Sequence, residues 1–108
     1  MELNEYQQEV HETAYFQADY NANYLGLALC GEAGEIANKL KKLWRVGASE
    51  PTDEEAREIA LEIGDVMWYC SELATTLGYT LDDVAAMNID KIHSRIARGT
   101  LEGDGDNR

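Results

Sequence analysis

A short run of helix-breaking residues divides the middle of this chain. The segment Val46-Gly47-Ala48-Ser49-Glu50-Pro51 contains a glycine and the only proline of the sequence. Thr52, followed three residues later by Glu55, matches the capping box that opens a helix. Long stretches with helical apolar spacing flank this break on both sides. We therefore expect two antiparallel helices that meet at a tight bend.

Apolar residues at helical spacing predict four helices in total. We expect them over residues 4–17, 24–44, 52–77 and 80–97. A polar break over residues 19–23 separates the first two, and Gly78 ends the third. The third helix has an alternating four and three spacing, as in helical bundles, at Ile59, Ile63, Val66, Cys70, Leu73 and Leu77. The predicted fold class is all-α, a four-helix bundle-like arrangement of antiparallel helices.

The helical domain covers residues 1–98. Residues 99–108 are rich in glycine and aspartate, and we expect them to form a flexible tail. A chain of 108 residues buries a limited fraction of its surface, and small domains often gain core by association. The core is therefore expected to be completed by dimerisation or by higher association of identical chains.

The charge balance limits the classes of partner. With 21 acidic and 9 basic residues, the net charge is −12. This charge opposes binding to nucleic acid and to anionic membranes, and it favours cations. The sequence contains no apolar run of membrane-spanning length, and residues 1–5 lack the basic start of a signal peptide. We expect a soluble, cytoplasmic protein.

Four carboxylates mirror one another about the bend. Glu32 and Glu35 precede it, whereas Glu62 and Asp65 follow it. In an antiparallel pair of helices that turns at residues 46–52, Glu35 lies level with Glu62 and Glu32 lies level with Asp65. The i, i+3 spacing places both members of each pair on one helical face. Acidic groups held this close repel one another unless a cation sits between them.

These carboxylates are therefore a candidate metal site. Oxygen-only ligation selects hard cations, so Mg²⁺ is expected, with Mn²⁺ as a substitute. The alternative interpretation is that they form a solvated acidic surface, since an acidic chain produces some ExxE pairs by chance. The matched register of the two pairs, and the position of Glu32 in line with an apolar stripe, favour the metal site.

A polar stripe interrupts the inner face of the fourth helix. Asn88, Lys91 and Arg95 share one face there and are candidates to hold phosphate groups. The alternative is that the basic residues only complement the dipole at the end of the helix.

The carboxylate pattern resembles that of a known family. Gly31-Glu32-Ala33-Gly34-Glu35, followed after 26 residues by Glu62-Ile63-Gly64-Asp65, is similar to the ExxE and ExxD signature of MazG-like, all-α nucleoside triphosphate pyrophosphohydrolases. Tyr6-Gln7, the polar stripe and the closing residues 105–108 resemble the small, single-domain, often phage-borne members. Gly31 departs from the pattern, since many members carry a further glutamate there.

The resemblance implies an activity. A nucleoside triphosphate would be cleaved between its α and β phosphates by water, with Mg²⁺ held by Glu32, Glu35, Glu62 and Asp65. Glu35, together with Glu32, is the candidate catalytic group that orients or deprotonates the water. Asn88, Lys91 and Arg95 would bind the phosphates and the sugar. The family also implies a homodimer or homotetramer.

Other functions remain open at this stage. A dUTPase-type hydrolase or a phosphoribosyl-ATP pyrophosphohydrolase of the same fold would share the metal chemistry and differ in substrate. A non-enzymatic helical regulatory or interaction module would use the carboxylates as a surface or as a structural cation site. The sequence does not identify the preferred base or sugar.

Overall fold

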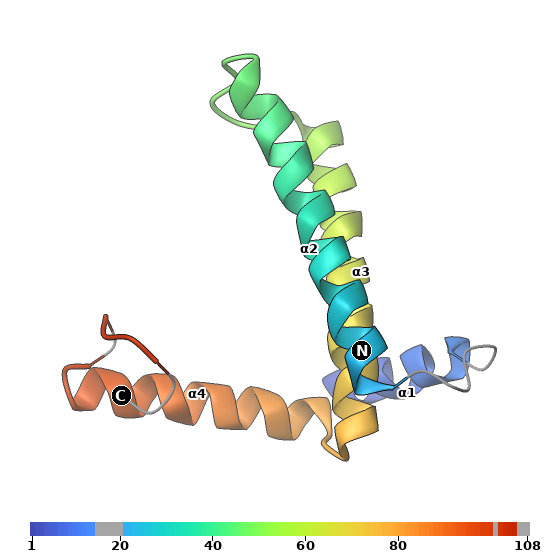
Figure 1. Ribbon diagram of the computed structural model, residues 1–108, viewed down its shortest axis with the longest axis vertical. Coiled ribbons are helices and arrows are strands. Elements are labelled where there is room, and N and C mark those ends of the chain that lie inside the picture. The colour runs from blue at the N-terminus through green and yellow to red at the C-terminus, as the bar shows by residue number, and fades with distance from the viewer. Residues whose placement is uncertain (15–20, 101, 106–108) are drawn as a thin grey trace.

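The structure of the protein is a computed structural model, which describes residues 1–14, 21–100 and 102–105. Within these residues it contains helices and no strand, which confirms the all-α prediction (Figure 1). The helices are α1 (Leu3–Thr13), α2 (Ala22–Arg45), α3 (Asp53–Leu77) and α4 (Leu81–Ala97). α1 ends earlier than predicted, with Ala14 as its C-cap, and residues 15–17 of the predicted range lie outside the described residues.

Local capping signals explain most helix ends. The Thr52 hydroxyl accepts a hydrogen bond from the Glu55 N–H (3.2 Å), and the Glu55 carboxylate accepts one from the Thr52 N–H (2.8 Å). These two bonds form the predicted capping box, in which each side chain satisfies an otherwise unpaired N–H. The left-handed backbone of Gly78, with φ of 85°, ends α3. The Thr80 hydroxyl accepts from the Asp83 N–H (3.1 Å) at the start of α4.

α2 begins two residues earlier than predicted. Asn21 caps the helix by accepting from the Tyr24 N–H (2.9 Å), so Ala22 and Asn23 are already helical. An asparagine side chain satisfies a free N–H group of the first turn, which makes it a good N-cap. The first residues of the break, Asp19 and Tyr20, lie outside the described residues.

α2 and α3 form a long antiparallel hairpin. α1 crosses the end of this hairpin that is remote from the bend, where it packs against α3 (Figure 1). α4 leaves the end of α3 at a sharp elbow and extends away from the hairpin. Within the described residues α4 contacts α1 and α3 but not α2. One end of α4 is therefore anchored, and the rest of it projects as an arm.

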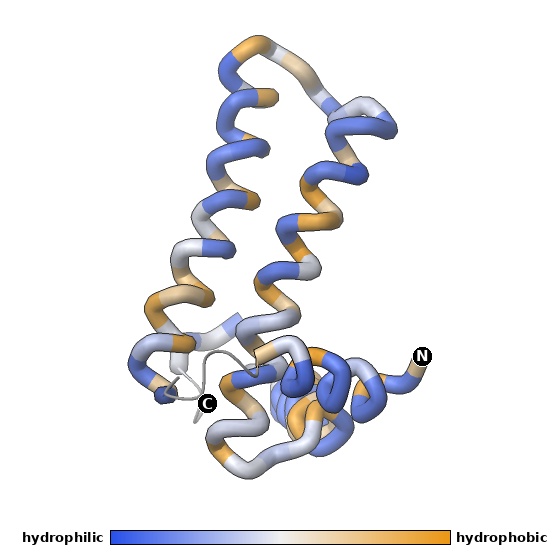
Figure 2. Tube along the Cα trace, turned by 90° about the vertical axis from the view of Figure 1, so that its right-hand side faces the viewer, coloured by the Kyte–Doolittle hydropathy of each residue, from blue (hydrophilic) through white to orange (hydrophobic). Residues whose placement is uncertain are grey.

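One chain covers little of its apolar surface. Among the described residues, the buried apolar side chains are Val10, Ala14, Leu25 and Ala74. Hydrophobic residues recur along the whole length of both hairpin helices (Figure 2). In the predicted core stripe of the third helix, Ile63 is 46% exposed and Leu77 is 59% exposed. α4 projects away instead of lying along the hairpin, so none of the described helices covers these two side chains fully.

The chain therefore has the four predicted helices but does not close a bundle core by itself. Completion of that core by a second copy stays a prediction. Within the described residues, each helix is either too short or too polar to cross a lipid bilayer.

Candidate metal centre and phosphate-binding arm

The α2–α3 hairpin brings three of the four predicted carboxylates together. Oxygen atoms of Glu32, Glu62 and Asp65 lie within 4.8 Å of one another. Glu32 comes from α2, and the other two come from α3. Glu32 and Glu62 are half-buried, whereas Asp65 is exposed. We call this group the acidic trio.

The register of the hairpin produces this meeting. Glu62 lies near Glu32 and also faces Lys39, whose ammonium nitrogen is 3.9 Å from a Glu62 oxygen. Glu32 and Lys39 are two helical turns apart on α2, so Glu62 lies level with the residues midway between them, Glu35 and Ile36. This register agrees with a hairpin that turns at residues 46–52.

Glu35 is the carboxylate that the trio does not include. Its side chain is exposed on α2 and lies at the rim of the group. It is near enough for its charge to raise the pKa of Glu32, although burial and the charges of Asp65 and Glu62 contribute more to that rise. Glu35 is therefore not a member of the trio, but its charge acts on the trio through Glu32.

The electrostatics of the trio favour a bound cation. Burial raises the pKa of the Glu32 carboxyl above its usual value, and the negative charges of Asp65, Glu62 and Glu35 raise it further. Each effect disfavours the charged form of Glu32 in the absence of a counter-charge. A cation between the oxygens reverses this balance, because the charged carboxylates then attract it. Lys39 gives the trio one long cationic contact, 3.9 Å from its ammonium nitrogen to a Glu62 oxygen.

Two tyrosines, Tyr6 and Tyr69, interact electrostatically with the trio, and neither was predicted from the sequence as a site residue. Burial and then the charge of Asp65 raise the pKa of Tyr6 on α1. Burial raises the pKa of Tyr69 on α3, and the neighbouring groups Tyr24, Glu32 and Asp65 raise it further. Tyr69 follows Asp65 by one helical turn, so helical spacing could have found it. Tyr6 has no such local signal because α1 reaches the hairpin only through tertiary packing.

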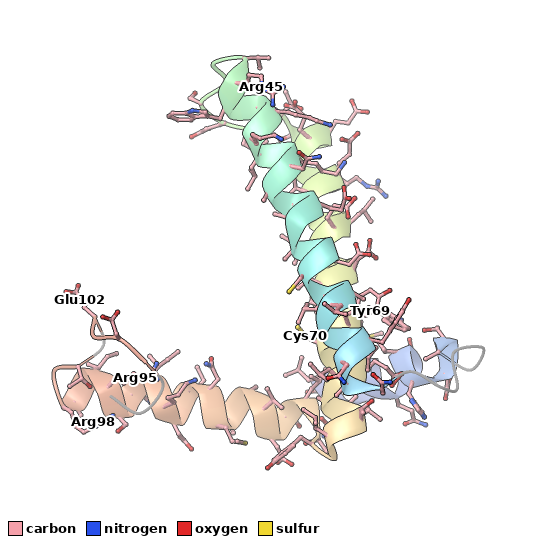
Figure 3. All side chains as sticks on the ribbon, viewed as in Figure 1. Arg45, Tyr69, Cys70, Arg95, Arg98 and Glu102 are labelled. Atoms are coloured by element: carbon pink, nitrogen blue, oxygen red, sulfur yellow. The ribbon has the colours of Figure 1, made fainter. Side chains whose placement is uncertain are left out.

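A hydrogen bond from a tryptophan of α3 holds α1 beside this site. The Trp68 indole N–H donates to the Thr13 hydroxyl of α1 (2.8 Å). The Trp68 and Tyr69 rings meet edge to face, with centroids 4.9 Å apart. Figure 3 shows Tyr69 on the hairpin, close to the end that α1 crosses. The wall of the site near Tyr69 is thus fixed by packing between α1 and α3.

The predicted polar stripe lies on the projecting arm. Asn88 and Lys91 are exposed, and with Tyr79, Val84 and Met87 they line a cavity of about 320 Å³. Figure 3 shows Arg95 toward the outer end of α4, away from Tyr69 and Cys70 on the hairpin. Since α4 does not contact α2 among the described residues, a single chain does not bring the stripe and the trio together.

The residues after α4 turn back over the arm. The Thr100 N–H donates to the Arg95 carbonyl oxygen (2.8 Å), and the left-handed Gly99 (φ 71°) allows this reversal. The Arg95 guanidinium donates to the Gly105 carbonyl oxygen (3.4 Å), and Arg95 is 6% exposed as a result of this packing. The flexibility predicted for residues 99–108 stays a prediction, and residues 101 and 106–108 lie outside the described residues.

Comparison with known proteins identifies relatives of the chain. The family model described as the MazG nucleotide pyrophosphohydrolase domain matches residues 21–99. This range includes the trio, Glu35 and the polar stripe. The chain is also 45% identical over 86 residues to the Gene 37 protein of Mycobacterium phage L5, which covers 80% of this chain and 75% of the phage protein. No solved structure matches the chain significantly.

Proposed function

Because the chain belongs to the MazG nucleotide pyrophosphohydrolase family, we propose that it hydrolyses nucleoside triphosphates to monophosphates and pyrophosphate. The observation that carries this proposal is the acidic trio, in which three carboxylates from two helices present oxygens within 4.8 Å of one another. Such a group is electrostatically unfavourable unless it binds a cation. The cytoplasm, which holds the nucleoside triphosphate pool, is the proposed location.

The donor set fits Mg²⁺. All its ligand atoms are carboxylate oxygens, which hard divalent cations prefer, and Mn²⁺ accepts the same donors. In the proposal Glu32, Glu62 and Asp65 hold the metal, with Glu35 as a further ligand from the rim. When bound, Mg²⁺ would lower the pKa of a coordinated water and neutralise charge on the phosphates.

Glu35 is the proposed general base, and Glu32 is proposed to help it orient the attacking water. The Glu35 carboxylate is exposed, and its charge is near enough to raise the pKa of the Glu32 carboxyl in the trio. It would accept a proton while the water oxygen bonds to the α phosphorus. The bond from that phosphorus to the bridging oxygen breaks, and pyrophosphate leaves with the electron pair. The pKa of Glu32 is raised by burial and by neighbouring negative charges, so a bound cation would lower it and favour the charged carboxylate.

Asn88, Lys91 and Arg95 are the proposed phosphate and sugar ligands. In one chain they lie on the projecting α4 arm and not at the trio, so the proposal requires a second chain to supply them. The apolar surface left exposed on α2, α3 and α4 supports the same association, since it includes Leu27 at 76% and Met87 at 56%. We propose a homodimer or homotetramer in which the arm of one chain reaches the trio of another.

The first experiment measures products. Purified protein is incubated with Mg²⁺ and each common and deaminated nucleoside triphosphate, and monophosphate, pyrophosphate and orthophosphate are assayed separately. The proposal predicts equal amounts of monophosphate and pyrophosphate, abolished by a chelator. The same panel includes dUTP and phosphoribosyl-ATP, which separates the sister activities of this fold. Stabilisation by Mg²⁺ without turnover of any nucleotide would refute the enzymatic proposal and favour a helical interaction module.

Two variants test the assignment of residues. Glu62→Gln removes one charge from the trio and is expected to abolish hydrolysis while helicity is kept. Glu58→Gln is the matched control, since Glu58 is an exposed glutamate one turn earlier on α3 and outside the trio. Loss of activity in both variants, or in neither, would contradict the proposed site.

Mixing inactive chains tests whether two chains build each site. The double variant Lys91→Ala, Arg95→Ala lacks the phosphate ligands but keeps the trio. When it is refolded together with Glu62→Gln chains, half of random dimers are mixed, and one of their two sites is intact. About a quarter of wild-type activity should therefore return. A mixture as inactive as its components would show that trio and stripe act within one chain.

A further inference from the structure

A buried glutamine on α1 holds the elbow between α3 and α4. The Gln7 side-chain N–H groups donate to the Thr75 hydroxyl (3.0 Å) and to the Tyr79 carbonyl oxygen (2.9 Å). Its carbonyl oxygen accepts from the Leu81 N–H (2.8 Å). One side chain thus joins the last turn of α3, the connecting turn and the first residue of α4. Gln7 is 9% exposed, so little water competes for these bonds.

These contacts use both N–H groups and the carbonyl oxygen of the Gln7 amide. A buried amide is unfavourable unless it is hydrogen-bonded, and Gln7 bonds to α3, the turn and α4 at once. A rotation of α4 about the elbow would break the bond from Leu81 and leave a buried acceptor unpaired. Gln7 therefore resists a change in the direction of α4.

A second α1 side chain supports the same end of α4. The Asn4 side-chain oxygen accepts from the Asp82 N–H (3.0 Å), and Asn4 lies one helical turn before Gln7 on the same face of α1. The Thr80 hydroxyl accepts from the next N–H, that of Asp83 (3.1 Å). Three consecutive N–H groups at the start of α4 are thus paired with side chains, and two of those side chains come from α1.

The rest of α4 has little to hold its direction within the chain. Its contacts with the other described helices are confined to α1 and α3, and apolar residues along it are exposed, among them Val84 at 42% and Ile89 at 49%. Arg95 lies about 21 Å along the helix from Leu81, at 1.5 Å per residue. A 20° rotation at the elbow would therefore move Arg95 by about 7 Å.

We propose that Gln7, assisted by Asn4, is a positioning residue that fixes the direction of the α4 arm and thereby the place where Lys91 and Arg95 are presented. The part that concerns Lys91 and Arg95 rests on the proposed function. Gln7 is assigned no contact with nucleotide. It acts through the elbow, and it keeps α4 extended toward a second chain instead of folded back along its own hairpin.

The first test measures the direction of α4 without any activity. Spin labels are placed at the exposed positions Arg57 on α3 and Asp90 on α4, in a chain whose Cys30 and Cys70 are replaced by serine. Labelled chains are diluted into an excess of unlabelled chains, so that only distances within one chain contribute. Pulsed electron spin resonance is expected to give a narrow distance distribution for the parent. It should be broadened or shifted by Gln7→Ala.

A neighbouring glutamine provides the control. Gln8 has the same side chain and lines the same surface groove, but it is exposed and none of the described bonds to the elbow comes from it. Gln8→Ala is expected to leave the distance distribution unchanged. An unchanged, narrow distribution in a folded Gln7→Ala chain would overturn the proposal. If Gln7→Ala does not fold, Gln7→Glu decides in its place. The glutamate keeps the acceptor for the Leu81 N–H but loses both donors, so it should shift the distance distribution. An unshifted distribution would refute the positioning role of Gln7.

The second test connects the elbow to substrate binding. Displacement of the arm should raise the KM for a nucleoside triphosphate on the order of tenfold or more. The affinity for Mg²⁺ measured without nucleotide should not change, because the trio lies on α2 and α3. A shifted arm with an unchanged KM would refute the positioning role and leave only a structural one. If the protein turns over no nucleotide, the proposed function fails, while the distance measurement still decides whether Gln7 holds the arm.

Discussion

Replacing Glu32 by glutamine should stabilise the metal-free protein. Glu32 faces two further carboxylates, with oxygens within 4.8 Å. Two unit charges at this separation repel by ~3.5 kcal/mol at an effective dielectric constant of 20 and by ~0.9 kcal/mol in water. Because Asp65 is exposed and salt screens such pairs, the lower part of the range applies. Removal of one charge from two pairs should raise the free energy of unfolding by about 1–2 kcal/mol, or the Tm by roughly 5–10 °C.

The same substitution should weaken stabilisation by Mg²⁺. A ligand at one hundred times its Kd stabilises a folded protein by about 2.7 kcal/mol, which for a domain of this size is a Tm increase of roughly 10–20 °C. Glu32→Gln removes a ligand charge and should therefore lose most of the stabilisation by Mg²⁺. We expect this loss to exceed the stabilisation of about 1–2 kcal/mol that the substitution gives the metal-free protein. The order of stability should therefore reverse, with the variant more stable in chelator and the wild type more stable in Mg²⁺.

Thermal unfolding followed by circular dichroism measures both effects. Protein concentration is held constant, because association makes Tm depend on it. Glu58→Gln, outside the trio, is the control and should keep the full Mg²⁺ increment. A Glu32→Gln protein that is less stable than wild type in chelator, or that keeps the full Mg²⁺ increment, would refute the interpretation of the trio as a repulsive cation site.

Three further predictions concern pH and the helix ends. The pKa of Glu32 is raised in the folded state, so folding favours its protonated form, and the contribution of Glu32 to metal-free stability should fall as pH rises above the ordinary value of 4.5. The difference in urea midpoint between wild type and Glu32→Gln measures this contribution, and that difference should change sign in saturating Mg²⁺. Thr52→Ala breaks the capping box and should destabilise the protein by about 1 kcal/mol, whereas Thr76→Ala, at a hydroxyl in the last turn of α3 that donates to the Glu72 carbonyl oxygen, tests whether loss of any threonine does the same. Gly78→Ala places a side chain at φ of 85° and should lower the free energy of unfolding by about 1 kcal/mol; an unchanged urea midpoint would show that the helix end adapts.

Local signals in the sequence were sufficient to predict that there are four helices in the described residues and to place the bounds of α3. The capping box at Thr52 and the glycine at position 78 act within a few residues, so the bounds of α3 follow from them. The meeting of Glu32 with Glu62 and Asp65 follows from the length of the bend, because a tight turn fixes the level of every residue along an antiparallel pair. The ligand role of these carboxylates stays a prediction.

The position of Glu35 shows where helical spacing stops being informative. An i, i+3 pair is offset by about 60° around the helix axis, at 3.6 residues per turn. This offset is enough to leave the Glu35 side chain exposed at the rim, while Glu32 faces the other helix. Spacing alone therefore indicates a shared face but does not decide which carboxylate lies between two helices.

The direction of α4 had no signal in the sequence. The bond between the Leu81 N–H and Gln7 joins residues 74 positions apart, and local propensity carries no information on such a contact. The exposure of Ile63 and Leu77 was not predictable for a similar reason. Their apolar spacing predicts a partner surface but does not specify whether that surface belongs to the same chain. Helical spacing identifies an apolar face but not what covers it.

The hairpin geometry also has a kinetic consequence. Pairs of residues close to the bend are near in sequence, so we expect them to meet early in folding, whereas Glu32 and Asp65 close a much longer loop and are expected to meet late. Contacts that form after the transition state change the rate of unfolding and leave the rate of folding nearly unchanged. A cation held by these carboxylates would therefore lengthen the lifetime of the closed hairpin without helping it to form. The chain would fold equally fast with or without the cation, and would open more slowly once the cation is bound.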